Sequence, residues 1–206
     1  MTAARMALMA WLEPVSLRGP GAALEPLAVK HLDDLIDSVK DGELWNLWYT
    51  TIPRPEAMRA EIDRRLRLQA EGSMLPFAVL DPLSGKALGM TTYMRADAVN
   101  RRLEIGSTWY RRSVHKTPLN TQCKLLLLRH AFEALGCIAV EFRTHFFNQP
   151  SRRAIERLGA KLDGVLRQHM RAGDGSLRDT CVYSVIASEW PAVKSNLNWQ
   201  LTKPRE

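Results

Sequence analysis

The feature that most constrains the fold is the order of strands and helices in the second half of the chain. LPFAVLD and KALGMTTYMRAD, separated by a Pro-Leu-Ser-Gly turn, predict an antiparallel hairpin. The alternating stretch NRRLEIGSTWYRR predicts the next strand, and a long helix is expected over 119–135, with Lys124 on its outer side. CIAVEFRTHF and NQPSRRAIERLG repeat the order of strand then helix, and the turn AGDGSL joins two final strands. This order predicts one α/β (α+β) domain around a central sheet.

The first third of the chain adds a strand, two helices and an aromatic stretch. PVSLRG predicts a strand, and apolar residues at helical spacing predict a helix from about Ala28 that Gly42 ends. PEAMRAEIDRRLRLQAEG predicts a helix, because a proline opens it and a glycine closes it. LWNLWYTTIPRP predicts irregular backbone or a short helix. We therefore expect an N-terminal extension over 1–14, one domain over 15–190 and a charged, aromatic tail over 191–206.

The charge balance favours an anionic partner. The 206 residues carry a formal net charge of +7, which suits nucleic acid, an acidic protein face or a phosphate-rich cofactor. Nucleic acid is not favoured, because the sequence has no zinc-finger spacing and no aromatic–glycine RNA-binding signature. The three cysteines form no CxxC pair, which suggests a reducing compartment and hence the cytoplasm. The N-terminal apolar run is too short to cross a bilayer, so no membrane association is expected, nor any metal cofactor.

The junction HKTPLNTQCK, between a strand and the long helix, is a candidate anion site. The first amides of a helix lack internal partners and lie at the positive end of the helix dipole. Thr117 and Pro118 fit the N-cap and first helical positions. In open sheets, ligands bind beyond the carboxyl ends of strands, where this loop is expected. A plain capped helix is the alternative. The candidate phosphate-binding residues are Lys116, Thr117, Leu119, Asn120, Thr121 and Gln122.

A series of motifs resembles one family. VSLRG, EIGSTW, NTQCKLLLLRHAFE, FNQPSRRAIERLGAKLDGVLRQHM and DGSLRDTCVYSVIASEW follow the order of the GNAT-fold acyltransferases. The most similar type is that of the ribosomal-protein N-terminal acetyltransferases (RimJ/RimL type), over roughly 15–190. The resemblance implies a mostly antiparallel, twisted sheet with one splayed parallel strand pair, flanked by helices. It also implies acetyl-CoA as co-substrate and a primary amine as acceptor.

The resemblance also implies which residues contact the cofactor. The strand GSTWY, with Trp109 and Tyr110, would bind the pantetheine arm through its backbone, and the following loop would hold the pyrophosphate. The family loop is (Arg/Gln)-x-x-Gly-x-(Gly/Ala), whereas residues 115–120 here read HKTPLN, so the contacts must be assigned from the helix start. Asn148 would bond the cofactor, or it is a turn or N-cap residue. Ser151 would relay a proton or bond the CoA sulfur region, or it is an ordinary helix-start serine.

Amide formation needs a group that accepts the proton of the amine. Glu104, in LEIG, is the first candidate, and its alternative role is a salt bridge with Arg101 or Arg102. Many family members carry a tyrosine acid at the position of Ile155, so that acid is missing here. The alternative bases are His115, His145 and His169.

The aromatic stretch LWNLWYTTIP is a candidate wall of the acceptor site. Trp45, Trp48 and Tyr49, with Glu104, could surround an amine, including by cation–π contact. Their alternative role is a core contact or a homodimer contact. The expected acceptor is a protein N-terminus, an amino acid or polyamine, or an aminoglycoside-like compound. The alternative function is a catalytically weak or inactive CoA-binding or CoA-sensing protein.

Overall fold

The computed structural model describes residues 11–203. Within them, eight strands form one sheet in the order β1-β2-β3-β4-β5-β6-β8-β7. The strands are β1 (Leu17–Gly19), β2 (Ala22–Pro26), β3 (Met74–Leu80), β4 (Ala87–Asp97), β5 (Arg102–Tyr110), β6 (Ala139–His145), β7 (Lys161–Arg171) and β8 (Leu177–Ile186). The α-helices are α2 (Leu32–Lys40), α3 (Met58–Ala70), α4 (Leu119–Arg129), α5 (Gln149–Leu158) and α6 (Trp190–Thr202). The short helices are η1 (Val29–His31), η2 (Leu44–Asn46), η3 (Pro55–Ala57), η4 (Arg112–Val114) and the π-helical η5 (His130–Ala134).

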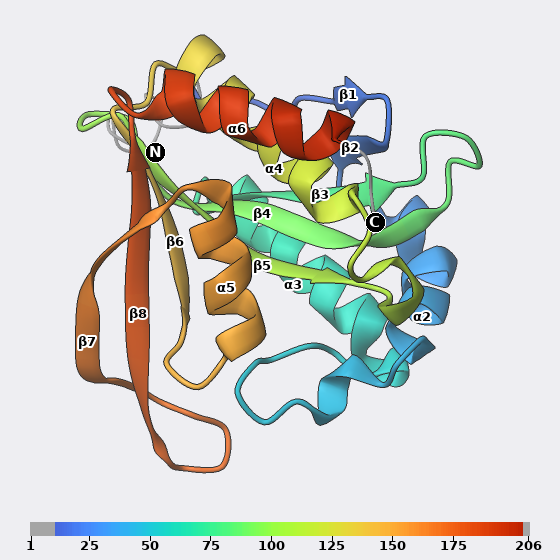
Figure 1. Cartoon of the computed structure of the whole chain (residues 1–206). Helices are drawn as coiled ribbons and strands as arrows, with labels where there is room; N and C mark the ends of the chain where they lie inside the picture. The colour runs from blue at the N-terminus through green and yellow to red at the C-terminus, as the bar shows by residue number, and fades with distance from the viewer. Residues whose placement is uncertain (1–10, 204–206) are drawn as a thin grey trace.

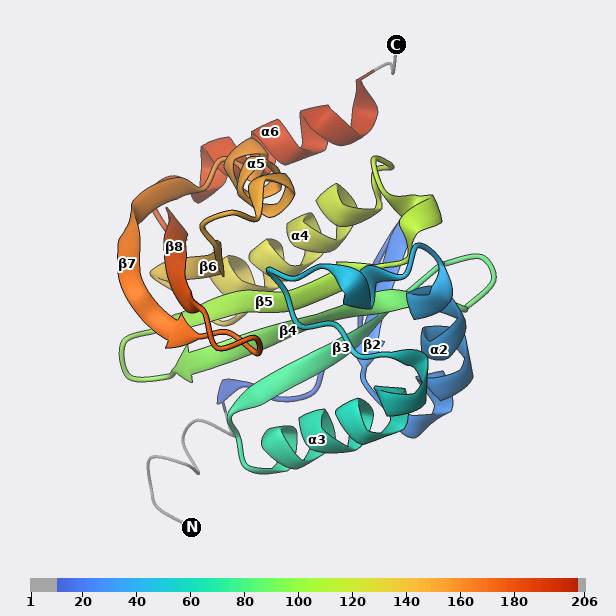
Figure 2. The same cartoon turned by 90° about the horizontal axis from the view of Figure 1, so that it is seen from below.

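Helices cover both faces of the sheet (Figures 1 and 2). α4, backed by α6, covers one face, and α2 with α3 covers the other. On the first side, which we call the α4 face, the hydroxyl of buried Tyr93 donates to the Leu127 carbonyl at 2.6 Å. On the second side, the α3 face, Leu35, Ile62 and Met90 belong to a separate apolar cluster. The sheet therefore has two apolar cores, one beneath each helix layer.

β5 and β6 are the parallel neighbours in this sheet, and they separate. They pair at three positions, of which Glu104 opposite Glu141 is the last. Beyond that pair the strands diverge toward their C-terminal ends (Figure 1). A bulge in β5 accompanies the divergence, since Ser107 has a φ of +47° and the β4–β5 register shifts there. The mostly antiparallel sheet with one splayed parallel pair is thereby confirmed.

The elements follow most of the sequence predictions, and the first third of the chain contains two strands, β1 and β2, where one is predicted. The long helix is α4 continued by the π turn η5. The segment 191–206, expected as a tail, instead contributes most of α6, and the Trp190 ring stacks on Phe132 at 5.3 Å. Apolar Trp190, Val193 and Leu197 explain the difference, because they are buried against the α4-face core. Of the expected extension 1–14, residues 1–10 lie outside the described chain, and Trp11 Nε1 donates to the Leu135 carbonyl at 2.9 Å.

Cysteines and apolar helices add two further observations. Cys123, Cys137 and Cys181 are free and buried, as their lack of pairing predicts. No helix within residues 11–203 combines the length and the apolar character that a membrane crossing requires.

Candidate active site

Glu104 lies where β5 and β6 separate, and its side chain is buried on the α3 face. Its Oε2 is 2.9 Å from Arg95 Nε and 3.6 Å from Arg143 Nε. Burial raises the pKa of the Glu104 carboxyl, and the charges of Arg95 and Arg143 oppose that rise. The salt bridge to Arg101 or Arg102 is not formed, because Arg102 instead pairs with Glu141 at 2.7 Å. A carboxyl of this kind can take up a proton nearer neutral pH than an exposed glutamate can.

Gly106 gives the Glu104 carboxylate its room. A Cβ at position 106 would come within 2.7 Å of Glu104 Oε1 and 3.1 Å of Met94 Sδ. The carboxylate therefore folds over a glycine two residues along the same strand, on the same face. The motif EIGSTW contains this glycine, but the sequence alone assigned it no role. The pattern Glu-x-Gly inside a strand was the available signal, because a strand glycine often marks a close approach.

Trp48 and Tyr49 lie in the loop after η2, and Trp48 contacts the segment just before α5. The ring of Trp48 lies edge-on to His145 at 5.1 Å and to Tyr49 at 5.7 Å, and 5.9 Å from Phe147. In Figure 1 this loop (cyan) runs below β5 and α5. Trp45 does not join the group. It packs against the α3-face core, and Arg54 lies 5.9 Å above its ring.

The three candidate histidines lie in different surroundings. His145 is buried beside Trp48, and its Nδ1 accepts the Phe147 N–H at 3.1 Å. Burial and the charge of Arg178 lower the pKa of His145. His115 Nε2 lies 2.9 Å from the Tyr110 carbonyl oxygen, at the far end of β5 from Glu104.

His169 is held on β7, with its Nδ1 3.2 Å from Thr180 Oγ1. Of the three histidines, His145 alone is thus packed into the aromatic group around Trp48.

The start of α4 leaves backbone donors open. α4 begins at Leu119, as the sequence predicts, but Pro118 is its N-cap residue and not its first helical residue. Thr117 Oγ1 still accepts the Leu119 N–H at 3.3 Å. The Asn120 and Thr121 N–H groups have no hydrogen-bond partner within the described chain. These N–H groups, at the positive end of the helix dipole, can hold an anion.

Side chains outside the loop fix its shape. Asp41, just after α2, accepts from Arg111 Nε at 2.8 Å and from Ser113 Oγ at 2.6 Å. The Ser113 and Arg111 hydrogen bonds lower the pKa of the Asp41 carboxyl to about 2. Tyr110 donates its hydroxyl to Asn120 Oδ1 at 3.2 Å, which turns this side chain away from the helix start. No sequence pattern identified Asp41, since the contact spans some seventy residues.

Lys116 is an exposed cation of this loop, next to the helix start. Its φ of +62° is a left-handed conformation that a non-glycine residue rarely adopts. Side chains of Trp109 and Gln122 are not presented to the loop. Trp109 is buried in the α3-face core, and the buried Gln122 amide packs against Gly19.

The side chain of the N-cap residue caps the start of α5, unlike at the start of α4. Asn148 Oδ1 accepts the Ser151 N–H at 3.1 Å, which is an N-cap interaction. The Ser151 hydroxyl makes no hydrogen bond among residues 11–203. The structure thus gives Asn148 the capping role that the sequence left open.

Lys124 is a buried cation on the inner side of α4. Its Nζ donates to Thr108 Oγ1 at 2.9 Å and lies 3.4 Å from Thr91 Oγ1. Burial lowers the pKa of the Lys124 ammonium to about 8. Sequence periodicity placed this lysine on the outer side of the helix, which is wrong, because its polar partners are on β4 and β5.

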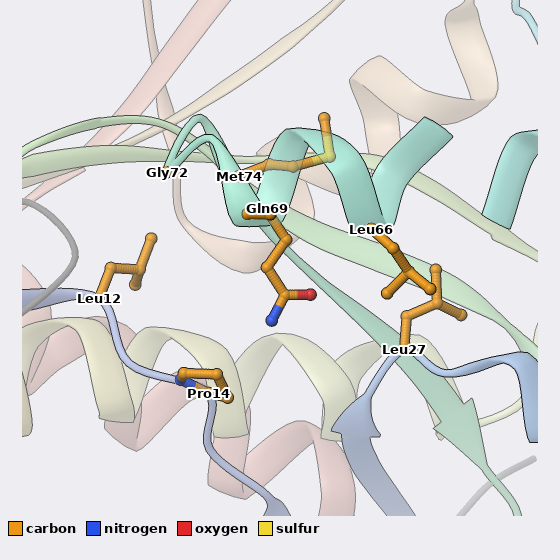
Figure 3. A pocket seen from close by; sticks show the side chains of 8 residues that line it. Leu12, Pro14, Leu27, Leu66, Gln69, Gly72 and Met74 are labelled. Atoms are coloured by element: carbon orange, nitrogen blue, oxygen red, sulfur yellow. The ribbon is translucent and has the colours of Figure 1, made fainter. Parts of the chain in front are cut away.

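A cavity of about 380 Å³ lies apart from these residues, at the C-terminal end of α3 (Figure 3). Its walls are mostly apolar and come from the chain before β1, from α3 and from the start of β3. None of the candidate catalytic or ligand residues lines it. The lining residues are Leu12, Pro14, Leu27, Leu66, Gln69, Ala70, Gly72 and Met74.

Comparisons with known proteins agree with this geometry. The family model of the acetyltransferase (GNAT) domain matches residues 22–161, more than half of the chain. "Putative ribosomal N-acetyltransferase YdaF" of Bacillus subtilis (strain 168) is 30% identical over 110 residues, which are 53% of this chain and 59% of that protein. The chain thus matches less than two thirds of this relative's length.

Solved structures extend the likeness over most of the chain. A GCN5-related N-acetyltransferase from Brucella melitensis is 35% identical, with a TM-score of 0.81 over 93% of this chain and 87% of that one. Mycobacterium smegmatis RimJ in complex with CoA-disulfide is 20% identical, with a TM-score of 0.75 over 91% and 93% of the two chains, and shows likeness of fold. These matches confirm the resemblance found in the sequence motifs.

Proposed function

Because the chain belongs to the GNAT family of acetyltransferases, we propose that it transfers an acetyl group from acetyl-CoA to a primary amine. The observation that carries the proposal is the buried Glu104 at the point where β5 and β6 separate. A base in that position can deprotonate an amine held beside the gap between the strands. The name of the relative YdaF, "Putative ribosomal N-acetyltransferase", supports a ribosomal protein amine among the acceptors, and a protein N-terminus is one such amine.

The residues around the splayed strands fit acetyl-CoA. The free N–H groups of Asn120 and Thr121 suit its pyrophosphate, and exposed Lys116 adds a positive charge. Among residues 11–203, no strand pairs with the β6-facing edge of β5 beyond Glu104, so the backbone groups of this edge suit the pantetheine amides. Trp109 and Tyr110 contribute through their backbone, since both side chains are buried. When bound, acetyl-CoA supplies the thioester that makes the acetyl group reactive.

Glu104 acts as the general base. In its ionised form it accepts a proton from the amine, directly or through a water molecule. Arg95 and Arg143 keep the carboxylate oriented and ionised in spite of its burial. The rate should therefore rise with pH through a pKa above that of an ordinary glutamate.

The aromatic residues around Trp48 and the start of α5 provide acceptor binding and a proton donor. Trp48, Tyr49 and His145 form a wall of the acceptor site on the α3 face. The free hydroxyl of Ser151 returns a proton toward the departing thiolate, the role that a tyrosine has in other family members. Asn148 holds Ser151 in place through its cap. We assign the reaction to the cytoplasm, which suits three unpaired cysteines.

A CoA-binding protein without transferase activity is the second candidate. The observation that favours it is Ile155, a buried residue at the position of the family's tyrosine acid. The experiment that separates the two incubates the protein with acetyl-CoA and a panel of amines and follows free thiol. Amine-dependent thiol release supports transfer. A thermal shift with CoA but no release with any amine supports the second candidate, and the lack of both overturns each of them.

A further inference from the structure

We propose that the acceptor carries a carboxylate as well as its amine, and that Arg178 binds this carboxylate. The inference rests on the proposed function, because it names the substrate class of the same site. Arg178 lies on β8, beyond the C-terminal end of β6, and no motif of the sequence gave it a role.

Strand register sets Arg178 on the same face of the sheet as Glu104. Thr180 of β8 pairs directly with His145 of β6, so their side chains share a face. Arg178 is two residues from Thr180 and therefore lies on that face as well. Glu141 is four residues from His145 and pairs with Glu104. Glu104, His145 and Arg178 thus all lie on the α3 face.

Arg178 differs from the other arginines of this face in having no carboxylate partner. Arg95 lies 2.9 Å from Glu104, and Arg143 lies 2.9 Å from Glu141. Arg178 forms no ion pair with any residue in 11–203, and its Nε is buried without a hydrogen-bond partner. Buried donors are almost always satisfied in proteins, and a guanidinium matches a carboxylate through two parallel hydrogen bonds. A carboxylate of the ligand would provide the partner that the protein does not.

The electrostatic interactions of Arg178 with Glu104 and His145 support a place for Arg178 in the acceptor site. Burial lowers the pKa of the Arg178 guanidinium, and the negative charge of Glu104 opposes this. The charge of Arg178 also contributes to the lowered pKa of His145. The guanidinium therefore acts electrostatically on both ends of the acceptor site. Glu104 meets the amine of the acceptor, and Arg178 meets its acid group.

The experiment compares acid and amide members of matched amine pairs. The pairs are glutamate with glutamine, both as their α-amides, and the dipeptide Ala-Glu with Ala-Gln, both amidated at the C-terminus, so that the two pairs separate single amino acids from peptides. Binding to the CoA-saturated protein is measured by calorimetry, and kcat/KM by thiol release. The variants are Arg178→Gln, Arg178→Lys and, as matched control, Arg171→Gln, an exposed arginine of the same hairpin.

We expect the wild-type protein to prefer the acid in at least one pair by about 10- to 100-fold. Arg178→Gln should bring that ratio close to 1, Arg178→Lys should keep part of it, and Arg171→Gln should keep all of it. CoA affinity should be the same in all four proteins. No acid preference in the wild type, or a preference that survives Arg178→Gln, would overturn the inference. An Arg178-dependent preference in binding without turnover would support it while removing the proposed transferase activity.

Discussion

The two strand–helix units β5–α4 and β6–α5 have the same local order, but their helix starts differ in whether the N-cap side chain caps the backbone N–H groups. At the start of α5, Asn148 accepts the Ser151 N–H and closes the helix end. At the start of α4, Asn120 is engaged by the Tyr110 hydroxyl, and backbone donors remain open. The difference follows from position in the helix. Asn148 is the N-cap residue of α5, whereas the N-cap residue of α4 is Pro118, whose side chain has no acceptor for the N–H groups of the first turn.

The paired glutamates of the two strands show a second contrast. Glu141 is matched by Arg102 and Arg143, each within 3 Å of a carboxylate oxygen. Glu104, directly opposite, is more deeply buried and has a raised pKa. The first is a structural ion pair, and the second has the properties of a base.

Glu104→Gln is expected to have the largest effect and tests the contrast between the glutamates. Loss of the base should lower kcat/KM by about 10²- to 10⁴-fold, whereas Glu141→Gln should change it by only a few fold. Steady-state thiol release over a range of pH provides the measurement. The wild-type rate should fall at low pH as Glu104 becomes protonated, and Glu104→Gln should lose this dependence. Equal losses in both variants would remove the distinction.

A negative charge placed at either helix start tests the contrast between α4 and α5. Asn120→Glu should weaken CoA binding by about 100-fold, because a carboxylate competes with the pyrophosphate and repels it. Gln149→Glu, at the exposed first position of α5, should leave CoA affinity within about twofold. Calorimetry with CoA measures both. If the α5 variant loses as much affinity as the α4 variant, the assignment of the two helix starts is wrong.

Removing the loop anchor should have a moderate effect. Asp41→Asn weakens the contacts to Arg111 and Ser113 and should raise the Kd for CoA by about 3- to 10-fold. Asp63→Asn, an exposed partner of Arg59, is the control and should have no effect.

The pKa of Asp41 sets the pH below which its contacts to Arg111 and Ser113 are lost. The pKa of Asp41 is lowered to about 2, so its stabilisation is complete above the ordinary value near 3.8 and is lost as pH falls through 2. The effect of Asp41→Asn on CoA affinity should therefore be constant between about pH 5 and 8. A clear change of that effect within this range would contradict the assignment.

The buried cation of α4 is expected to affect the stability of the fold and not the binding of CoA. The pKa of Lys124 is about 8 in the folded protein and 10.5 as its ordinary value, so the unfolded chain binds more protons between these values. The burial penalty is therefore complete below pH 8 and relieved as pH rises toward 10.5. The advantage of Lys124→Met over wild type in urea unfolding should shrink over this range by on the order of 3 kcal/mol. A pH-independent difference would show that the ammonium is not buried in solution.

Local patterns were sufficient for most of the fold. Proline, glycine and apolar spacing predicted α3, α5 and the β3–β4 hairpin within a few residues. The C-terminal helix was missed, because its proline and aromatic residues resemble a tail until they are seen packed against α4.

The site residues also fall into those with a local sequence signal and those placed by contacts between distant segments. Glu104 and the candidate anion site before α4 could be proposed from the sequence, because each is signalled by its own strand or helix. Asp41 and Arg178 were not, because their positions beside the site depend on contacts between segments far apart in the sequence. Lys124 was assigned to the wrong side of its helix, because periodicity treats every lysine as exposed.

The central claim is that the open helix start of α4 holds the pyrophosphate of CoA, and one titration tests it most directly. CoA and pantetheine, which lacks the pyrophosphate and the nucleotide, are compared by calorimetry on the wild type and on Asn120→Glu. The wild type should bind CoA at least about 10-fold more tightly than pantetheine, and Asn120→Glu should remove that difference. Equal affinity of the wild type for the two ligands, or a difference that survives Asn120→Glu, would contradict the claim.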